Sequence, residues 1–387
     1  MNDSNNDMTA DGLMKIEQET LEKAEAFYAE NAKKAATMFG YPSRNVSLSP
    51  VTRRLLMMHY DSPFSNNCGD IDERGNYLMD TKQTEKKIVG LFAEKLGFGK
   101  DFWGYVTSGG TESNSAAVAF AFNKYPDGVL YYSQAAHYSV AKAAKGYRAY
   151  VIPADDKDRM DIGAFIEAAK KNYFDSGSPA NVVLTFGTTQ CGECDDIDEV
   201  IKLLDNEHIA HFVHVDAALF GGIPNDRRGA PKLTDLKTRG VDSACVSLHK
   251  YIGFPDVHSV FVATEKPHFD TIDYIGQHDT TVSGSRSIPA YALYNHISEQ
   301  FFDKNEDEYI ANVNFFEENL KAADVNFYRA DKSNIFVIDC PDDIICKKYQ
   351  LSSFFVNEGG RRVKKAHIII FSHHDKQVMR QLIDDLK

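Results

Sequence analysis

A lysine and an aspartate near the middle of the chain are the residues whose types and positions best suit covalent chemistry. Lys250 closes the run Ser247-Leu248-His249-Lys250, which follows a short apolar stretch. Most such lysines are solvated surface charges, but a partly desolvated lysine has a lowered pKa and can act as a Schiff-base nucleophile. Asp216 ends an earlier apolar stretch, in His214-Val215-Asp216-Ala217-Ala218. If both stretches are parallel strands of one sheet, the two side chains face the same crevice; otherwise Asp216 is a helix cap.

Three further segments could bind an anionic aromatic ligand at the same edge. The run Thr107-Ser108-Gly109-Gly110-Thr111 joins an apolar strand to an apolar helix. Its glycines allow close approach to an anion, and the helix start supplies N–H groups and a positive dipole end, so we expect a phosphate there rather than a plain N-cap. His137 follows another strand; it could stack on a ring and bind a substrate carboxylate, although most histidines are structural. Thr188, in Gly187-Thr188-Thr189, could hydrogen-bond the edge of the ring.

These motifs stand at the ends of predicted strands, in a stretch of chain where strands alternate with helices. Such alternation is typical of an α/β fold with a mostly parallel sheet flanked by helices. We expect an N-terminal arm and helical segment (1–83), a large domain (84–289) and a small C-terminal α+β domain (290–387). The seven strands are expected at 103–106, 129–132, 149–152, 181–186, 211–215, 244–248 and 259–263.

The two ends of the chain have different patterns. The N-terminal arm carries an approximate helical stripe of apolar residues, which must pack on another surface: Leu13, Ile16, Leu21, Ala24 and Phe27. After Pro289 we expect one long amphipathic helix over about 291–320, then strands at 335–338 and 367–371, and a terminal helix from Asp375.

Composition narrows the classes of partner. The net charge of -13 disfavours binding to nucleic acid or to an anionic membrane. The first residues lack a signal-peptide pattern, and no apolar run approaches the roughly 20 residues that span a bilayer. We therefore expect a cytoplasmic protein with a small-molecule substrate. The pair Cys191-Gly192-Glu193-Cys194 has the spacing of a redox motif or of half a zinc site, but no second pair matches it, so no metal is expected.

The chain resembles the group II amino-acid decarboxylases that depend on pyridoxal 5'-phosphate (PLP). The resemblance lies in the motifs and in their order along the sequence: the phosphate loop, His137, Gly187-Thr188-Thr189, Asp216 and Lys250. The bacterial-type histidine decarboxylases are the most similar. The resemblance runs from about residue 64 to the C-terminus and implies PLP fold type I, which is aspartate-aminotransferase-like. It also includes Leu130-Tyr131-Tyr132-Ser133, His137-Tyr138-Ser139-Val140-Ala141-Lys142, Gly284-Ser285-Arg286 and Asn66-Asn67-Cys68-Gly69-Asp70.

The resemblance implies a role for each matching residue. Lys250 would form the Schiff base with PLP, Asp216 would pair with the ring nitrogen and make the ring an electron sink, and His137 would stack on the ring and orient the substrate. A homodimer with its active site at the subunit interface is also implied. The implied cofactor-binding residues are Gly109, Gly110, Thr111, His137, Thr188, Asp216, Ala218, Ser247, His249 and Lys250, with Gly284 and Ser285 reaching the phosphate in the neighbouring subunit.

The implied reaction is α-decarboxylation of an L-amino acid, with histidine as the best candidate and histamine and CO2 as products. Residues 251–258 depart from the bacterial histidine decarboxylases, which leaves aromatic, basic and other amino acids open. A fold type I aminotransferase or lyase is an alternative, in which Arg361 or Arg362 could bind the substrate carboxylate. A further alternative is a family member that binds ligands without catalysis. Such a protein would most simply be recognised by the loss of Lys250, which this chain retains.

Overall fold

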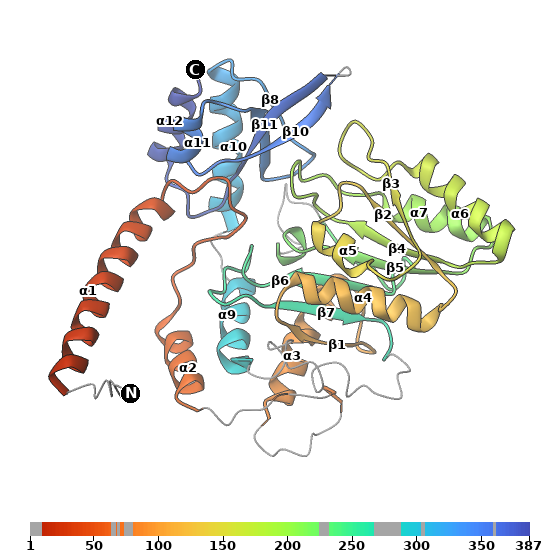
Figure 1. The fold of residues 1–387 in the computed structure, drawn as a ribbon, viewed down its shortest axis with the longest axis horizontal. Coiled ribbons are helices and arrows are strands. Elements are labelled where there is room, and N and C mark those ends of the chain that lie inside the picture. Colours follow the sequence, from red (N-terminus) through yellow and green to blue (C-terminus); the bar gives the residue numbers. More distant parts are fainter. Residues whose placement is uncertain are drawn as a thin grey trace, which may run out of the picture.

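A seven-stranded sheet forms the centre of the computed structural model, which describes residues 10–62, 67, 70–72, 80–223, 232–266, 288–302, 306–358 and 361–387 (Figure 1). The strand order is β1-β7-β6-β5-β4-β2-β3. Neighbours from β3 to β6 pair in parallel, and β7 is antiparallel to both β1 and β6. The mostly parallel sheet is thus confirmed, and each predicted strand matches an observed one to within one residue at either end. The strands are β1 (Trp103–Thr107), β2 (Val129–Ser133), β3 (Ala149–Ile152), β4 (Ala180–Thr185), β5 (His211–Asp216), β6 (Ser243–Ser247) and β7 (Ser259–Ala263).

Helices cover both faces of this sheet. In β1, Trp103 and Tyr105 pack in one cluster with Phe120 of α4, whereas Val106 packs in another with Val89 of α3. Alternate residues of a strand point to opposite faces, so α3 and α4 lie on opposite sides. Burial on both sides explains why strands such as β2 and β7 are nearly continuous apolar runs, whereas β3 is exposed at three of its four residues. The helices of this region are α3 (Lys82–Leu96), α4 (Gly110–Lys124), α5 (Tyr138–Ala143), α6 (Ile162–Ser176) and α7 (Ile197–Asn206).

The C-terminal part contains a second, antiparallel sheet in the order β10-β11-β9-β8. The sequence predicted β9 (Ile335–Asp339) and the end of β11 (Arg361–Ile369), but missed β8 (Phe327–Tyr328) and β10 (Ser352–Glu358). β8 has only two residues, and several β10 side chains are exposed, so neither gives an apolar run. The small domain is α+β, as expected.

The helices after Pro289 also differ from expectation. The predicted long helix corresponds to α9 (Ala290–Phe302) and α10 (Glu306–Ala322), with 303–305 outside the described residues. α9 packs against α2 (Pro50–Tyr60) and α3, whereas α10 packs against α12 (Lys376–Asp385). The predicted cap Asp375 begins α12, and α11 (Asp343–Lys348), which was not predicted, lies between β9 and β10. The domain boundary near residue 289 remains a prediction.

The N-terminal arm is the helix α1 (Ala10–Ala35), which stands away from the body of the molecule (Figure 1). Its predicted apolar stripe is exposed: Leu13, Ile16, Leu21 and Phe27 are 46–60% accessible. In the part of the chain that the structure describes, no helix has both the length and the apolar character needed to cross a bilayer.

Candidate active site

Asp216 and Lys250 meet at the carboxyl-terminal edge of the large sheet. Asp216 is the last residue of β5, and Lys250 lies in the turn that follows β6. Because β5 and β6 are parallel neighbours, their ends reach the same edge. Burial lowers the pKa of Lys250, and the nearby Asp216 carboxylate opposes this shift. The structure therefore brings the predicted lysine and aspartate together.

An anion cradle opens beside them at the start of α4. Gly109 has a φ of 133°, in the region that favours glycine, and an added Cβ would lie 3.0 Å from Val257 Cγ1. A Cβ at Gly110 would lie 3.4 Å from Ser247 Oγ, so the end of β6 borders the loop. The N-cap Gly109 offers no side-chain cap, and the first-turn N–H groups with the positive end of the helix dipole suit a phosphate.

His137 lies at the same site, as the N-cap of α5. Its Nδ1 accepts from the backbone N–H of Ser139 at 3.3 Å and lies 2.7 Å from Ser139 Oγ. Burial lowers the pKa of His137; the Asp216 carboxylate acts in the opposite direction and Lys250 adds to the lowering. The three proposed catalytic side chains thus act on one another electrostatically.

Sequence reasoning missed a buried polar group between these residues. Asn114, on α4, donates from Nδ2 to Asp216 Oδ2 and to Ser139 Oγ, both at 2.8 Å. His214 lies two residues before Asp216 on β5, so both side chains point to the same face, and its Nε2 is 3.1 Å from Asn114 Oδ1. Neither residue has a clear signal in the sequence, because Asn114 stands in a run of polar residues at the start of α4 and His214 is one of three polar residues in β5.

The chain between α1 and α2 holds the lysine turn in place. Ser43 Oγ donates to His249 O at 2.9 Å, and the N–H of Arg44 donates to Lys250 O at 3.0 Å. The Arg44 guanidinium also donates to Gln300 Oε1 and lies 5.3 Å from the centre of the Tyr251 ring. These contacts join a segment for which the sequence suggested no role to the backbone that carries Lys250.

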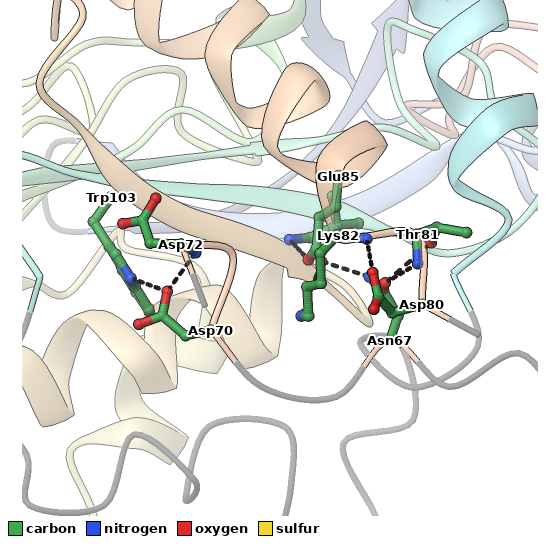
Figure 2. A network of polar contacts seen from close by, with 9 residues as sticks. Asn67, Asp70, Asp72, Asp80, Thr81, Lys82, Glu85 and Trp103 are labelled. Carbon is green, nitrogen blue, oxygen red and sulfur yellow. Dashed lines mark hydrogen bonds and ion pairs between the residues drawn. The ribbon is translucent and has the colours of Figure 1, made fainter. Parts of the chain in front are cut away.

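A second buried polar cluster supports the strand that enters the anion cradle (Figure 2). The Glu85 carboxylate accepts from Val106 N at 2.9 Å, from Lys82 Nζ at 3.1 Å and from Asn67 Nδ2 at 2.5 Å. Asp70, from the same early motif as Asn67, accepts from Trp103 Nε1 at 3.1 Å. Burial raises the pKa of Glu85, and the Lys82 ammonium is the main opposing influence. This cluster ties Asn67 and Asp70 to β1, directly before the cradle.

The other predicted ligand residues have different surroundings. The Thr188 hydroxyl is engaged in its own turn, where it accepts from Glu193 N at 3.1 Å and bonds to the Asp158 carboxylate. Ala218 N–H donates to Asp216 Oδ1 at 3.2 Å, and His249 Nδ1 lies 3.3 Å from His258 O. Gly284 and Ser285 lie outside the described residues, so their predicted contact with a neighbouring phosphate has no structural counterpart here.

The residues named in the alternative interpretations lie elsewhere. Arg361 and Arg362 are exposed at the start of β11, and the Arg362 guanidinium covers the Phe355 ring at 4.0 Å. Burial raises the pKa of Cys191 to about 12 and also raises that of Cys194, which disfavours the thiolate form. Among the described residues, no group of three or more His, Cys, Asp or Glu side chains could hold a metal ion.

The groups at the sheet edge fit PLP. A partly desolvated lysine suits its aldehyde carbon, an acceptor-only carboxylate suits a protonated ring nitrogen, and the glycine cradle suits its phosphate. Residues 106–283 match the family model of the pyridoxal-dependent decarboxylase conserved domain. The chain belongs to this family, and it is a PLP-dependent amino-acid decarboxylase of fold type I.

Individual relatives give further detail. Histidine decarboxylase of Pseudomonas entomophila (strain L48) is 34% identical over 342 residues, which cover 83% of this chain and 80% of that protein. Serine decarboxylase 3 of Oryza sativa subsp. japonica is 32% identical over 334 residues, covering 83% and 72%. The solved structure of L-methionine decarboxylase from Streptomyces sp.590 shares the fold with a TM-score of 0.77 at 20% identity, covering 95% of each chain.

Proposed function

We propose that this chain decarboxylates L-histidine to histamine and CO2 at the site formed by Lys250, Asp216 and His137. The observation that carries the proposal is the convergence of these side chains beside the glycine cradle. Several histidine decarboxylases at 32–34% identity support the choice of substrate. When bound, PLP supplies an electron sink for the electrons left on Cα as CO2 departs.

Each residue has a separate task in this proposal. Lys250 would hold the cofactor covalently through Nζ, and the burial that lowers its pKa increases the share of neutral, nucleophilic amine. Asp216, 4% exposed and held by Asn114, keeps a proton on the ring nitrogen through its carboxylate. Gly109, Gly110, Thr111, Ser247 and His249 would hold the phosphate. Ala218 would lie at the ring, and the Thr188 hydroxyl would donate to the ring only after releasing its bond to Asp158.

His137 orients the substrate as well as covering the ring. The bond between Cα and the carboxylate must lie perpendicular to the ring plane, since only then can its electrons enter the π system. A hydrogen bond from His137 to the substrate carboxylate favours this orientation. His137→Ala should therefore reduce turnover more than it reduces PLP retention, and His211→Ala, at the opposite end of β5, is the matched control.

The segment at 251–258 bears on the choice of substrate. Tyr251, Ile252 and Phe254 are at most 2% exposed, and the Phe254 ring packs 5.6 Å from that of His296. The first half of the stretch that departs from the bacterial histidine decarboxylases is therefore core packing directly after Lys250, whereas Val257 is 58% exposed and borders the cradle at Gly109. A change there can move the lysine turn and the pocket wall together, so a different amino acid is the main alternative.

We also propose a homodimer with the active site at its interface. The support is the exposed apolar stripe of α1 and the exposed Met57, Met58 and Tyr60 of α2, because grouped exposed apolar side chains are typical of protein–protein contact sites. Gly284 and Ser285 of one subunit would reach the phosphate in the other.

A panel of L-amino acids tests the proposed reaction. Purified protein with PLP is incubated with each amino acid, and amines and keto acids are identified by mass spectrometry, with Lys250→Ala as the inactive control. Histamine as the main product supports the proposal. Another amine in its place overturns the substrate, and a keto acid without CO2 overturns the reaction.

A further inference from the structure

In each contact around Asn114, chemistry determines which atom donates and which accepts the hydrogen bond. The assignment starts from Asp216. An ionised carboxylate can only accept hydrogen bonds. The atom of Asn114 that lies 2.8 Å from Asp216 Oδ2 must therefore be the amide NH2 group, and this settles the orientation of the amide. The second hydrogen of the same Nδ2 points to Ser139 Oγ, also at 2.8 Å. Ser139 Oγ accepts this bond.

The polarity continues from Ser139 to His137. A serine hydroxyl has one hydrogen, and Ser139 Oγ lies 2.7 Å from His137 Nδ1, where that hydrogen has an acceptor. The backbone N–H of Ser139 is directed at the same Nδ1 at 3.3 Å. Two donors meet one ring nitrogen, so Nδ1 carries a lone pair. In a neutral imidazole the proton then lies on Nε2.

The amide oxygen of Asn114 also has hydrogen-bond partners. Asn114 Oδ1 lies 3.1 Å from His214 Nε2 and 3.6 Å from Cys245 Sγ, and both of these atoms can donate to it. Burial lowers the pKa of His214 to about 4, so this imidazole is neutral and its Nδ1 accepts from Ser243 Oγ at 2.9 Å. Asn114 is 1% exposed; both of its amide hydrogens are donated and its oxygen accepts from His214, while the single hydrogen of the Cys245 thiol has Asn114 Oδ1 and Asp216 Oδ1 as acceptors, both at 3.6 Å. Neither aspartate nor leucine could replace both its donors and its acceptor.

We infer that Asn114 is a positioning residue that acts through Ser139 to hold His137 as the Nε2–H tautomer, while the same amide fixes the Asp216 carboxylate. With Nδ1 occupied by Ser139, Nε2 is the nitrogen left to meet a ligand. An N–H at this position can donate to a substrate carboxylate, whereas a lone pair would repel it. This last step rests on the proposed function of His137; the tautomer itself does not depend on the substrate.

Nitrogen NMR of histidine-labelled holoenzyme tests the inference without any substrate. The His137 signals are assigned by comparison with His137→Gln, and the ring shifts report which nitrogen is protonated. We expect Nε2–H in the wild type, and a mixture of tautomers in Asn114→Leu, which has a side chain of similar size but no polar atoms. Asn172→Leu is the matched control, because Asn172 is also buried but bonds to Tyr131, Ala168 and Arg148 instead.

If Asn114→Leu does not fold, a second pair of variants tests the same inference. Ser139→Thr keeps the hydroxyl and should keep the Nε2–H tautomer, whereas Ser139→Ala should shift the ring toward the mixture. For the amino acid that the panel identifies, kcat/KM should fall about 100-fold in Asn114→Leu with PLP still bound, as expected for lost positioning. Nδ1–H in the wild type, or a tautomer unchanged in both Asn114→Leu and Ser139→Ala, would overturn the inference. Failure to decarboxylate histidine would overturn only the proposed substrate.

Discussion

Replacing Asp216 by asparagine tests the electron-sink role with a minimal change of shape. The carboxylate is 4% exposed. Its Oδ2 accepts from Asn114 Nδ2 at 2.8 Å, and its Oδ1 accepts from Ala218 N at 3.2 Å and from Cys245 Sγ at 3.6 Å. An amide at 216 can offer an oxygen on only one of these two sides and sets its own NH2 against the donors on the other. It also cannot keep the ring nitrogen protonated. Losing one such charge-assisted contact in a dry site costs about 2.7–4 kcal/mol, which is about 10²–10³ in kcat.

The assay measures kcat and bound PLP in the same preparations. Asp216→Asn should retain PLP, because the cradle and Lys250 are unchanged, and should lose rate by the stated factor. Asp196→Asn is the matched control, since Asp196 is an exposed N-cap of α7 and asparagine caps helices equally well. Turnover of Asp216→Asn within a few-fold of the wild type would refute the role given to this carboxylate.

Three further predictions concern stability and assembly. Lys82→Met leaves Glu85 buried without its counter-charge and should lower the free energy of unfolding by about 3–5 kcal/mol at pH 7, as measured by urea denaturation. The double variant Lys82→Met with Glu85→Gln should recover part of this loss. An unchanged urea midpoint in Lys82→Met would contradict the role of the buried pair. Burial lowers the pKa of His214 to about 4 and that of His374 to about 3, below the ordinary value of 6.5. Their contribution to stability should therefore be complete above pH 6.5 and be lost as the pH falls through about 4. A urea midpoint that does not decrease when the pH is lowered from 7 to 4 would contradict this. Light scattering should find a dimer that Leu21→Glu with Phe27→Glu weakens, and a fully active monomer would refute the assembly.

The sheet and the main site residues could be predicted from the sequence because their signals are local. Strands buried on both faces are short apolar runs, and β4 and β6 are buried along their whole length. Chemistry-bearing residues such as Asp216 and Lys250 follow such runs directly. The rule that ligands lie beyond the carboxyl ends of parallel strands then places them together without any knowledge of strand order.

The supporting contacts could not be predicted because they depend on strand order and register. Asn114 and Asp216 are 102 residues apart, and their contact requires α4 to pack over the end of β5. Ser43 meets His249 across 206 residues. Strand β10 could not be predicted for another reason. It pairs with β11 through backbone hydrogen bonds that leave several of its side chains in water, so it gives no apolar pattern.

The lysine that binds the cofactor covalently can be identified by chemical trapping. Holoenzyme is reduced with borohydride, digested and mapped by mass spectrometry, which locates the phosphopyridoxyl group on a single lysine. We expect Lys250 to carry this group, because the amine of this lysine is desolvated beside Asp216. A modified Lys142, which also lies near His137, or any other modified lysine with Lys250 unmodified, would contradict the account.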